Sequence, residues 1–256
     1  MLTLTEIYNK HLEKLNDKKV ALRYSDRTWF HSSSAGLCAR KHFFSSIQQV
    51  EGTPIDDNTR RLFRLGDIVH EDIQNAVREY ADENALPILI EKEIYLEELN
   101  VRGFIDLALL DRNTLYDIKT CNSWKWTKMF GRAGTGMPDM HQQLQLATYG
   151  LWAKEEYNLD NINLVLAYYN KEVELMSDEM MAEAELYWNQ VVDLTEPVDE
   201  GTEGVDFTMN VPNMGKMNWI KPKVELGIAP VMEWECNEKY CQYFKVCGGG
   251  LKNVRS

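Results

Sequence analysis

Two short stretches of the sequence combine residue types that could hold a metal ion and act on a phosphate ester. The first is Gly103-Phe104-Ile105-Asp106, and the second is Asp117-Ile118-Lys119. Between them lies Asp111-Arg112-Asn113-Thr114, a run of turn-forming residues bounded by apolar stretches. Because such a run links two strands of a hairpin, we expect the two motifs to lie on neighbouring antiparallel strands.

The register of this hairpin decides whether the acidic residues meet. If the turn has an even number of residues, so that the strands close at Leu110 with Asn113 or at Leu109 with Thr114, Asp106 lies directly opposite Asp117. Opposed residues point to the same face, with their Cβ atoms about 5 Å apart. Lys119 shares the face of Asp117, because side chains alternate along a strand. Two opposed carboxylates on an apolar hairpin repel each other unless a cation lies between them, and oxygen ligands suit Mg²⁺ or Mn²⁺.

The same hairpin carries further groups that this chemistry needs. The backbone carbonyl of Ile118 can supply another oxygen, and Lys119 can orient or deprotonate a water and offset charge on a phosphoryl oxygen. These parts are sufficient for metal-assisted attack on a phosphodiester. The alternative is an ordinary exposed strand, where Asp-x-Lys is common. The buried character of both strands and the upstream Gly103 favour the metal site.

Hydrophobic periodicity predicts an α/β domain with a central mixed sheet flanked by helices. We expect helices at 59–80, 138–157 and 177–193, and strands at 88–96, 102–110, 115–120 and 162–169. Three strands, a helical crossover and a fourth strand require a mixed sheet. Residues 1–256 would form a single domain, with a core at about 57–194. The Gly- and Pro-rich stretch 195–230 is expected to be a wrapping loop.

Polar residues on two predicted helices could face the hairpin. His70 borders the apolar stripe of the first helix, either as a core residue or as a nitrogen ligand to a metal such as Mn²⁺. Gly66, one turn earlier, would let this helix approach the sheet closely. His141, Gln145 and Tyr149 follow each other at intervals of four on the second helix. This stripe could face Lys119, or it could be an amphipathic helix edge.

A segment between the third strand and the second helix mixes indoles with cations. It contains Trp124, Lys125, Trp126, Lys128 and Arg132, followed by closely spaced glycines at 131–136. Indoles can stack on bases while cations hold phosphates, so these residues are candidates for DNA binding. The glycines suggest a mobile flap. Packing of the indoles beside a flexible loop is the alternative.

The overall charge argues against nucleic acid without excluding it. The formal net charge is −12, whereas phosphate contacts need Lys and Arg. A local basic patch can nevertheless lie on an acidic protein. Candidate clusters are Arg40-Lys41, Arg60-Arg61 with Arg64, Lys125 with Lys128 and Arg132, and Lys216 with Lys221 and Lys223.

The sequence contains no apolar run long enough to span a membrane. Its first residues include acidic side chains and lack the apolar core of a signal peptide, so we expect a cytoplasmic protein. Disulfides are improbable there. Of the five cysteines, Cys236, Cys241 and Cys247 cluster near the C-terminus and Cys38 lies far upstream. Four thiolates could bind an iron–sulfur cluster or zinc and join residues 1–56 to 195–256, with Cys121 a small buried residue.

Taken together, these residues resemble the PD-(D/E)xK nuclease superfamily in its RecB-like branch. The resemblance is to the iron–sulfur exonucleases of CRISPR adaptation and to the AddB nuclease domain. It covers Cys38 to Cys247 in the expected order and places the motif positions as follows: the His at His70, the two acids at Asp106 and Asp117, the lysine at Lys119, and the glutamine–tyrosine pair at Gln145 and Tyr149. One spacing departs from the family: four residues separate Cys236 from Cys241, where two are usual.

The resemblance implies a restriction-endonuclease-like core and a Mg²⁺- or Mn²⁺-dependent DNA exonuclease. Its substrate would be single-stranded DNA or DNA ends. Its setting would be recombination, repair, phage DNA processing or CRISPR adaptation, in a prokaryote or phage, with a protein partner of such a complex possible. It also implies a 4Fe–4S cluster on the four cysteines, with zinc as the alternative. A DNA-binding or assembly subunit that keeps the fold with little activity is the competing function.

Overall fold

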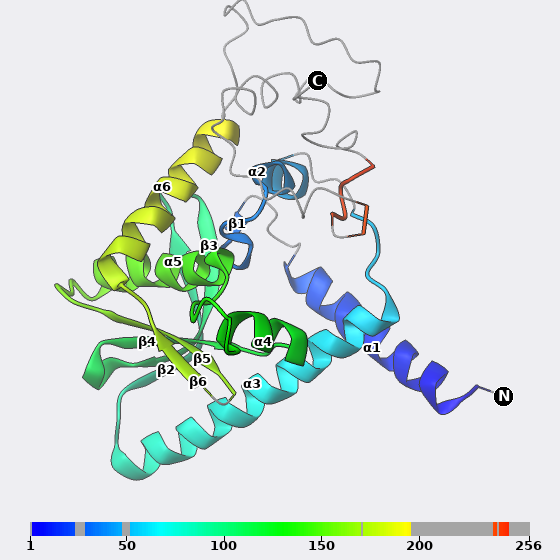
Figure 1. The fold of residues 1–256 in the computed structure, drawn as a ribbon, viewed down its shortest axis with the longest axis horizontal. Helices are drawn as coiled ribbons and strands as arrows, with labels where there is room; N and C mark the ends of the chain where they lie inside the picture. The colour runs from blue at the N-terminus through cyan, green and yellow to red at the C-terminus, as the bar shows by residue number, and fades with distance from the viewer. Residues whose placement is uncertain are drawn as a thin grey trace, which may run out of the picture.

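The computed structural model describes residues 2–23, 29–47, 52–169, 171–195, 238–239 and 241–245. It is an α/β fold with a mixed six-stranded sheet flanked by helices (Figure 1). The strands are β1 (Phe30–His31), β2 (Ile88–Leu96), β3 (Val101–Leu109), β4 (Thr114–Lys119), β5 (Asn163–Tyr168) and β6 (Lys171–Glu174). The helices of the core are α3 (Asp57–Asn84), α4 (Ser123–Phe130), α5 (Met140–Glu156) and α6 (Ser177–Thr195). The α/β class expected from the sequence is therefore confirmed.

An N-terminal segment adds elements that periodicity did not reveal. It contains α1 (Leu4–Arg23), β1, a short 3-10 turn (Ser32–Ser34), α2 (Ala39–His42) and a π-helical turn (Phe43–Ile47). The short strand β6 was also missed. Two-residue and four-residue strands are too short to show a period of two, so their places depend on the neighbouring strands. The stretch 195–230, expected to be a wrapping loop, lies almost wholly outside the described residues.

Strand β3 has three neighbours in the sheet. β2 pairs with it in antiparallel fashion from Leu96 opposite Val101 to Ile88 opposite Leu109, with one break at Glu91. The other edge is shared: β1 runs parallel to its first two residues, and β4 runs antiparallel to its last three. The middle of that edge therefore has no strand paired with it, and side chains fill the space. The candidate site lies in this gap.

The predicted hairpin register is confirmed by the pairing of β3 with β4. Leu109 lies opposite Thr114 and Leu107 lies opposite Tyr116, as the alignment of the two acids requires. The turn is a single 3-10 turn that ends at Asn113 in the left-handed conformation, with φ of 48°. β4 then pairs in parallel with β5, so this hairpin is joined to the rest of the sheet.

Helices α5 and α6 cover the sheet and complete the core. α5 contacts β4 and β5, and α6 packs along α5. The indole of Trp188 is fully buried and donates a hydrogen bond to Thr148 Oγ1 (2.8 Å). Among the described residues, no helix is long and apolar enough to cross a membrane.

Helix α3 begins where Asp56 accepts a hydrogen bond from the Thr59 N–H (2.9 Å), which satisfies a free donor of the first turn. Its N-terminal half differs from the expectation of a core-facing stripe. Leu62 and Leu65 are 64% and 57% exposed, and this half extends beyond the sheet to meet α1 (Figure 1). The apolar residues do recur at helical spacing, but the sheet does not reach far enough to cover them.

A buried histidine ties the N-terminal segment to α6. His42 Nε2 lies 2.8 Å from Tyr187 Oη, and burial lowers the pKa of His42 to about 3. The unfolded chain therefore binds a proton between about pH 6.5 and 3 that the folded chain does not. Stability from this group is present above pH 6.5 and is lost as pH falls through that window.

Replacing His42 should flatten the acid side of the stability profile. We expect His42→Gln to remove up to about 1.4 kcal/mol per pH unit of slope below about pH 6, because glutamine keeps a polar contact but does not titrate. Urea unfolding at a series of pH values measures this. The exposed His11→Gln is the control; equal slopes in wild type and His42→Gln would contradict the prediction.

Candidate active site

The hairpin opens at the point where the two acids meet. Backbone pairing of β3 with β4 stops at Leu107 and Tyr116. One step further, Asp106 turns its carboxylate to the neighbouring strand, and its Oδ2 accepts a hydrogen bond from the Ile118 N–H (2.7 Å). A side chain thus takes the place of a backbone carbonyl, which keeps the N–H satisfied while the strands diverge.

Lys119 lies at the centre of a chain of polar contacts. Its Nζ is 2.6 Å from Asp117 Oδ2 and donates a hydrogen bond to Gln145 Oε1 (3.0 Å). The Gln145 amide donates to Tyr149 Oη (2.9 Å), which also accepts a hydrogen bond from Ser32 Oγ (3.1 Å). Asp117 and Lys119 are in contact, and two of the three residues of the stripe on α5, Gln145 and Tyr149, belong to this chain. Ser32 was not expected, because nothing in its local sequence marks it.

Gly103 makes room for this chain. A Cβ at that position would lie 2.8 Å from Tyr149 Cε1 and would collide with the Ser32 hydroxyl. Any larger residue would therefore displace the two groups that position Gln145. Gly66 has a weaker steric role than expected, because its added Cβ would lie 3.5 Å from Thr120 Oγ1, an ordinary contact.

Three possible metal donors, one of which is Asp106, lie close together. One ligand atom each from His70, Glu91 and Asp106 fall within 4.8 Å of one another. His70 Nδ1 is 3.6 Å from Asp106 Oδ2. The expected donors His70 and Asp106 are thus together, whereas Asp117 lies outside this group and contacts Lys119 instead.

Glu91 is a candidate metal donor that the sequence pattern did not reveal. Its flanking residues pair as Ile90 with Leu107 and Lys92 with Ile105, so Glu91 lies at the level of Asp106. Its φ of 50° is in the left-handed region, which interrupts the ladder and redirects the side chain. Gln74 holds it there by donating to Glu91 Oε1 (2.7 Å) and to the Asp106 carbonyl (3.0 Å). The register of the β2–β3 hairpin, which places Glu91 at the level of Asp106, is the feature of the sequence that could have revealed this donor.

Burial sets the electrostatics of the site. Desolvation raises the pKa of Asp106 well above its usual value, and the neighbouring charge of Asp117 raises it further. Asp117, fully buried, also has a raised pKa from burial, opposed by the cation of Lys119. Burial lowers the pKa of His70, so its ring is neutral at neutral pH and able to bind a metal.

These residues fit a divalent cation. Asp117 Oδ1 is buried without a hydrogen-bond partner among the described residues, although an unpaired carboxylate oxygen is costly in the interior. The two acids carry more negative charge than Lys119 offsets. The backbone of Ile118 lies near the His70 ring and partly offsets the lowering of its pKa by burial. A mixed set of carboxylate, carbonyl and imidazole donors suits Mn²⁺ or Mg²⁺.

The residues expected to bind DNA lie on or beside α4 and divide into two groups. Trp124 is 71% exposed with Lys128 Nζ 5.6 Å from its ring centre, and Arg132 is also exposed. Lys125 is half-buried and pairs with Asp139 (2.9 Å). Trp126 packs against Phe130 and the core, with ring centres 4.8 Å apart. For Trp126 the structure therefore favours packing over base stacking.

The glycine-rich segment, expected to be a flap, folds back on the end of α4. Gly131 N–H bonds to the Thr127 carbonyl (2.9 Å) and Gly136 N–H to the Met129 carbonyl (2.8 Å), which closes the end of α4. An added Cβ at Gly131 or Gly134 would collide with carbonyl oxygens of that helix. The glycines permit close approach of the backbone.

The C-terminal cysteine segment contacts the N-terminal one. Thr53 N–H donates to the Gln242 carbonyl (3.1 Å), and the rings of Phe44 and Tyr243 lie 5.6 Å apart. Cys38 and Cys241 are both half-buried in this region. Their expected companions, Cys236 and Cys247, lie outside the described residues. Cys121, expected to be a small buried residue, is half-buried against the core.

No protein-family model and no curated protein matches the sequence. Among solved structures, the crystal structure of SSO0001 is similar over 94% of this chain and 96% of that one. The TM-score is 0.50 at 15% sequence identity. At this identity the likeness concerns the fold alone, which the two chains share over nearly their whole lengths.

Metal binding should stabilise the protein through the three donors. At about 100-fold excess over its Kd, Mn²⁺ should contribute about 2.7 kcal/mol to unfolding free energy. The effect should grow as pH rises through the raised carboxyl pKa, because protons compete for the same oxygens. Thermal unfolding with and without Mn²⁺ measures both.

Substitutions identify the donors. Asp106→Asn should abolish the Mn²⁺-induced shift, and Glu91→Gln should weaken Mn²⁺ binding about tenfold, or about 1.4 kcal/mol. The exposed Glu98→Gln on the neighbouring turn is the matched control. A Mn²⁺ shift that survives Asp106→Asn unchanged would place the metal elsewhere.

Proposed function

We propose that this protein is a metal-dependent DNA nuclease with a restriction-endonuclease-like core of the PD-(D/E)xK type. The observation that carries the proposal is the position of Lys119. Its ammonium group is held between Asp117 and Gln145, one strand away from the donors His70, Glu91 and Asp106. A fixed cation beside a cluster of metal donors is the arrangement that phosphodiester hydrolysis requires.

Each residue has a separate role in this proposal. A bound Mg²⁺ or Mn²⁺ would supply Lewis acidity and a more acidic water. Asp106, Glu91, His70 and the Ile118 carbonyl would hold that ion, and Asp117 would complete its charge balance through Oδ1. Lys119 orients the attacking water and offsets charge on the phosphoryl oxygens.

Two residues on α5 position the lysine. Gln145 fixes its ammonium group by accepting a hydrogen bond, and Tyr149 orients the Gln145 amide in turn. Burial and the nearby carboxylates raise the pKa of Tyr149, so its phenol stays protonated and neutral. Tyr149 therefore acts as a positioning group rather than as a base.

The proposed substrate is DNA, cleaved from an end and in single-stranded form. Trp124, Lys128 and Arg132 are exposed on or beside α4, where an indole and two cations could hold a base and its phosphates. The pairing of Lys125 with Asp139 leaves it less available. Recombination, repair, phage DNA processing and CRISPR adaptation all need such an activity, and the proposed location is the cytoplasm.

Cleavage assays test the nuclease directly. With Mn²⁺, end-labelled single-stranded DNA should be shortened, and Lys119→Met should reduce the rate by about 100-fold or more, because a preorganised charge is lost. Lys92→Met, on an exposed position of β2, should cleave as wild type. Binding without cleavage under any metal would instead favour the DNA-binding or assembly subunit.

A second proposal concerns the cysteines. We propose that Cys38, Cys236, Cys241 and Cys247 bind a 4Fe–4S cluster, with zinc as the alternative, and so fasten the two terminal segments together. The contacts of Thr53 with Gln242 and of Phe44 with Tyr243 support it, because they already bring these segments side by side.

Colour and metal content separate the two alternatives. Anaerobically purified protein should be brown, with broad absorption at about 400 nm that Cys241→Ser removes and Cys121→Ser leaves intact. A colourless protein that contains one zinc ion per chain would show that the four cysteines bind zinc and not an iron–sulfur cluster. Absence of both iron and zinc would contradict the fastening role.

A further inference from the structure

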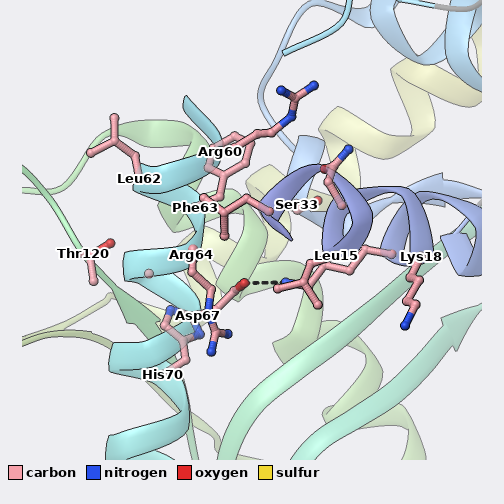
Figure 2. Close-up of a pocket in the computed structure, with 14 residues that line it drawn as sticks. Leu15, Lys18, Ser33, Arg60, Leu62, Phe63, Arg64, Asp67, His70 and Thr120 are labelled. Atoms are coloured by element: carbon pink, nitrogen blue, oxygen red, sulfur yellow. Dashed lines mark hydrogen bonds and ion pairs between the residues drawn. The ribbon is translucent and has the colours of Figure 1, made fainter. Parts of the chain in front are cut away.

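A groove of about 600 Å³ lies between α1 and α3 and leads to the proposed metal site (Figure 2). His70 and Thr120 line one end of it, next to Asp106 and Lys119 respectively. Figure 2 shows Phe63, Arg64, Asp67 and His70 along one side of α3, with α1 opposite. A molecule in the groove would therefore reach the metal donors without crossing another element.

The charge of the groove is opposite to that of the whole protein. Its charged lining residues are the cations Lys18, Lys19, Arg60 and Arg64 and the single carboxylate Asp67, whereas the chain carries −12. Lys18 and Arg64 form no ion pair with any described residue. Concentrated positive charge in a hollow attracts anions locally even on an acidic molecule.

The other two cations, Lys19 and Arg60, each form an ion pair with a carboxylate, and a phosphate could replace that carboxylate. Lys19 Nζ lies 2.6 Å from Asp67 Oδ2 (Figure 2), and Arg60 pairs with Asp57 (2.7 Å) one turn earlier on α3. The Lys19–Asp67 pair is exposed on both sides and contributes little in water, whereas Arg60 is 15% exposed and its partner Asp57 is 47% exposed. They therefore hold the cations ready at the groove without blocking it.

Apolar side chains lie among these cations. Phe63 is 58% exposed and Leu62 is 64% exposed, and both line the groove. Gly66 lines it between Phe63 and His70, although glycine destabilises a helix interior relative to alanine. An exposed phenyl ring between cations fits a nucleobase with its phosphates on either side.

We propose that this groove binds the single-stranded end of a DNA substrate and guides it to the metal donors. The inference rests on the proposed nuclease function and adds the path of the strand. Phe63 stacks on a base, while Lys18, Arg60 and Arg64 hold backbone phosphates. A duplex offers phosphates but keeps its base faces stacked inside, so it cannot use the phenyl ring.

Equilibrium binding in EDTA tests the groove without cleavage. Fluorescence anisotropy of a labelled oligothymidylate should show about tenfold weaker binding for Phe63→Ala and for Arg64→Glu, and Arg64→Glu should lower the salt slope by about one. Matched controls are available further along α3. Tyr80→Ala, at 55% exposure, and the exposed Arg78→Glu should bind as wild type.

The outcomes separate the groove from the nuclease. If wild-type protein cleaves DNA but the Phe63 and Arg64 variants bind it normally, the groove is overturned and the nuclease stands. If nothing is cleaved but both variants lose binding, the groove stands and the nuclease fails. Single-strand recognition is overturned if only Arg64→Glu weakens binding. It is also overturned if a blunt duplex binds as tightly as the oligothymidylate and loses as much affinity in both variants.

Discussion

The structure depends on the cost of burying two carboxylates beside each other. Asp106 and Asp117 sit where β3 and β4 diverge, and burial raises the pKa of both. The neighbouring residues reduce that cost: Lys119 pairs with Asp117, and the Ile118 N–H donates to Asp106. The remaining imbalance is what makes the site a strong candidate for a cation, because a metal removes the repulsion that the protein leaves in place.

The gap that holds these acids arises from the sheet itself. β1 and β4 share one edge of β3, and neither reaches the middle of it. Ser32, directly after β1, and Tyr149 from α5 enter beside Gly103, which has no side chain to exclude them. The N-terminal segment is therefore part of the site, although its short elements have little structure of their own to predict.

Charge is distributed unevenly over the molecule, and this bears on the proposed substrate. The acidic total keeps most of the surface unattractive to nucleic acid, whereas the cations between α1 and α3 are gathered beside His70. The exposed N-terminal half of α3 extends past the sheet and provides one wall of that hollow. An acidic protein can in this way direct an anionic strand to one place.

The sequence by itself determined the main elements, the α/β class and the register of the central hairpin, since these depend on local periodicity and turn residues. Strand alternation placed Lys119 on the face of Asp117, and the family resemblance, more than spacing, pointed to Gln145 and Tyr149. Only the tertiary structure decided that Glu91 joins His70 and Asp106, that Trp126 packs inward, and that Ser32 completes the chain to Tyr149. Those outcomes depend on a left-handed backbone at Glu91 and on which segments meet across β3, and neither is encoded in the spacing of neighbouring residues.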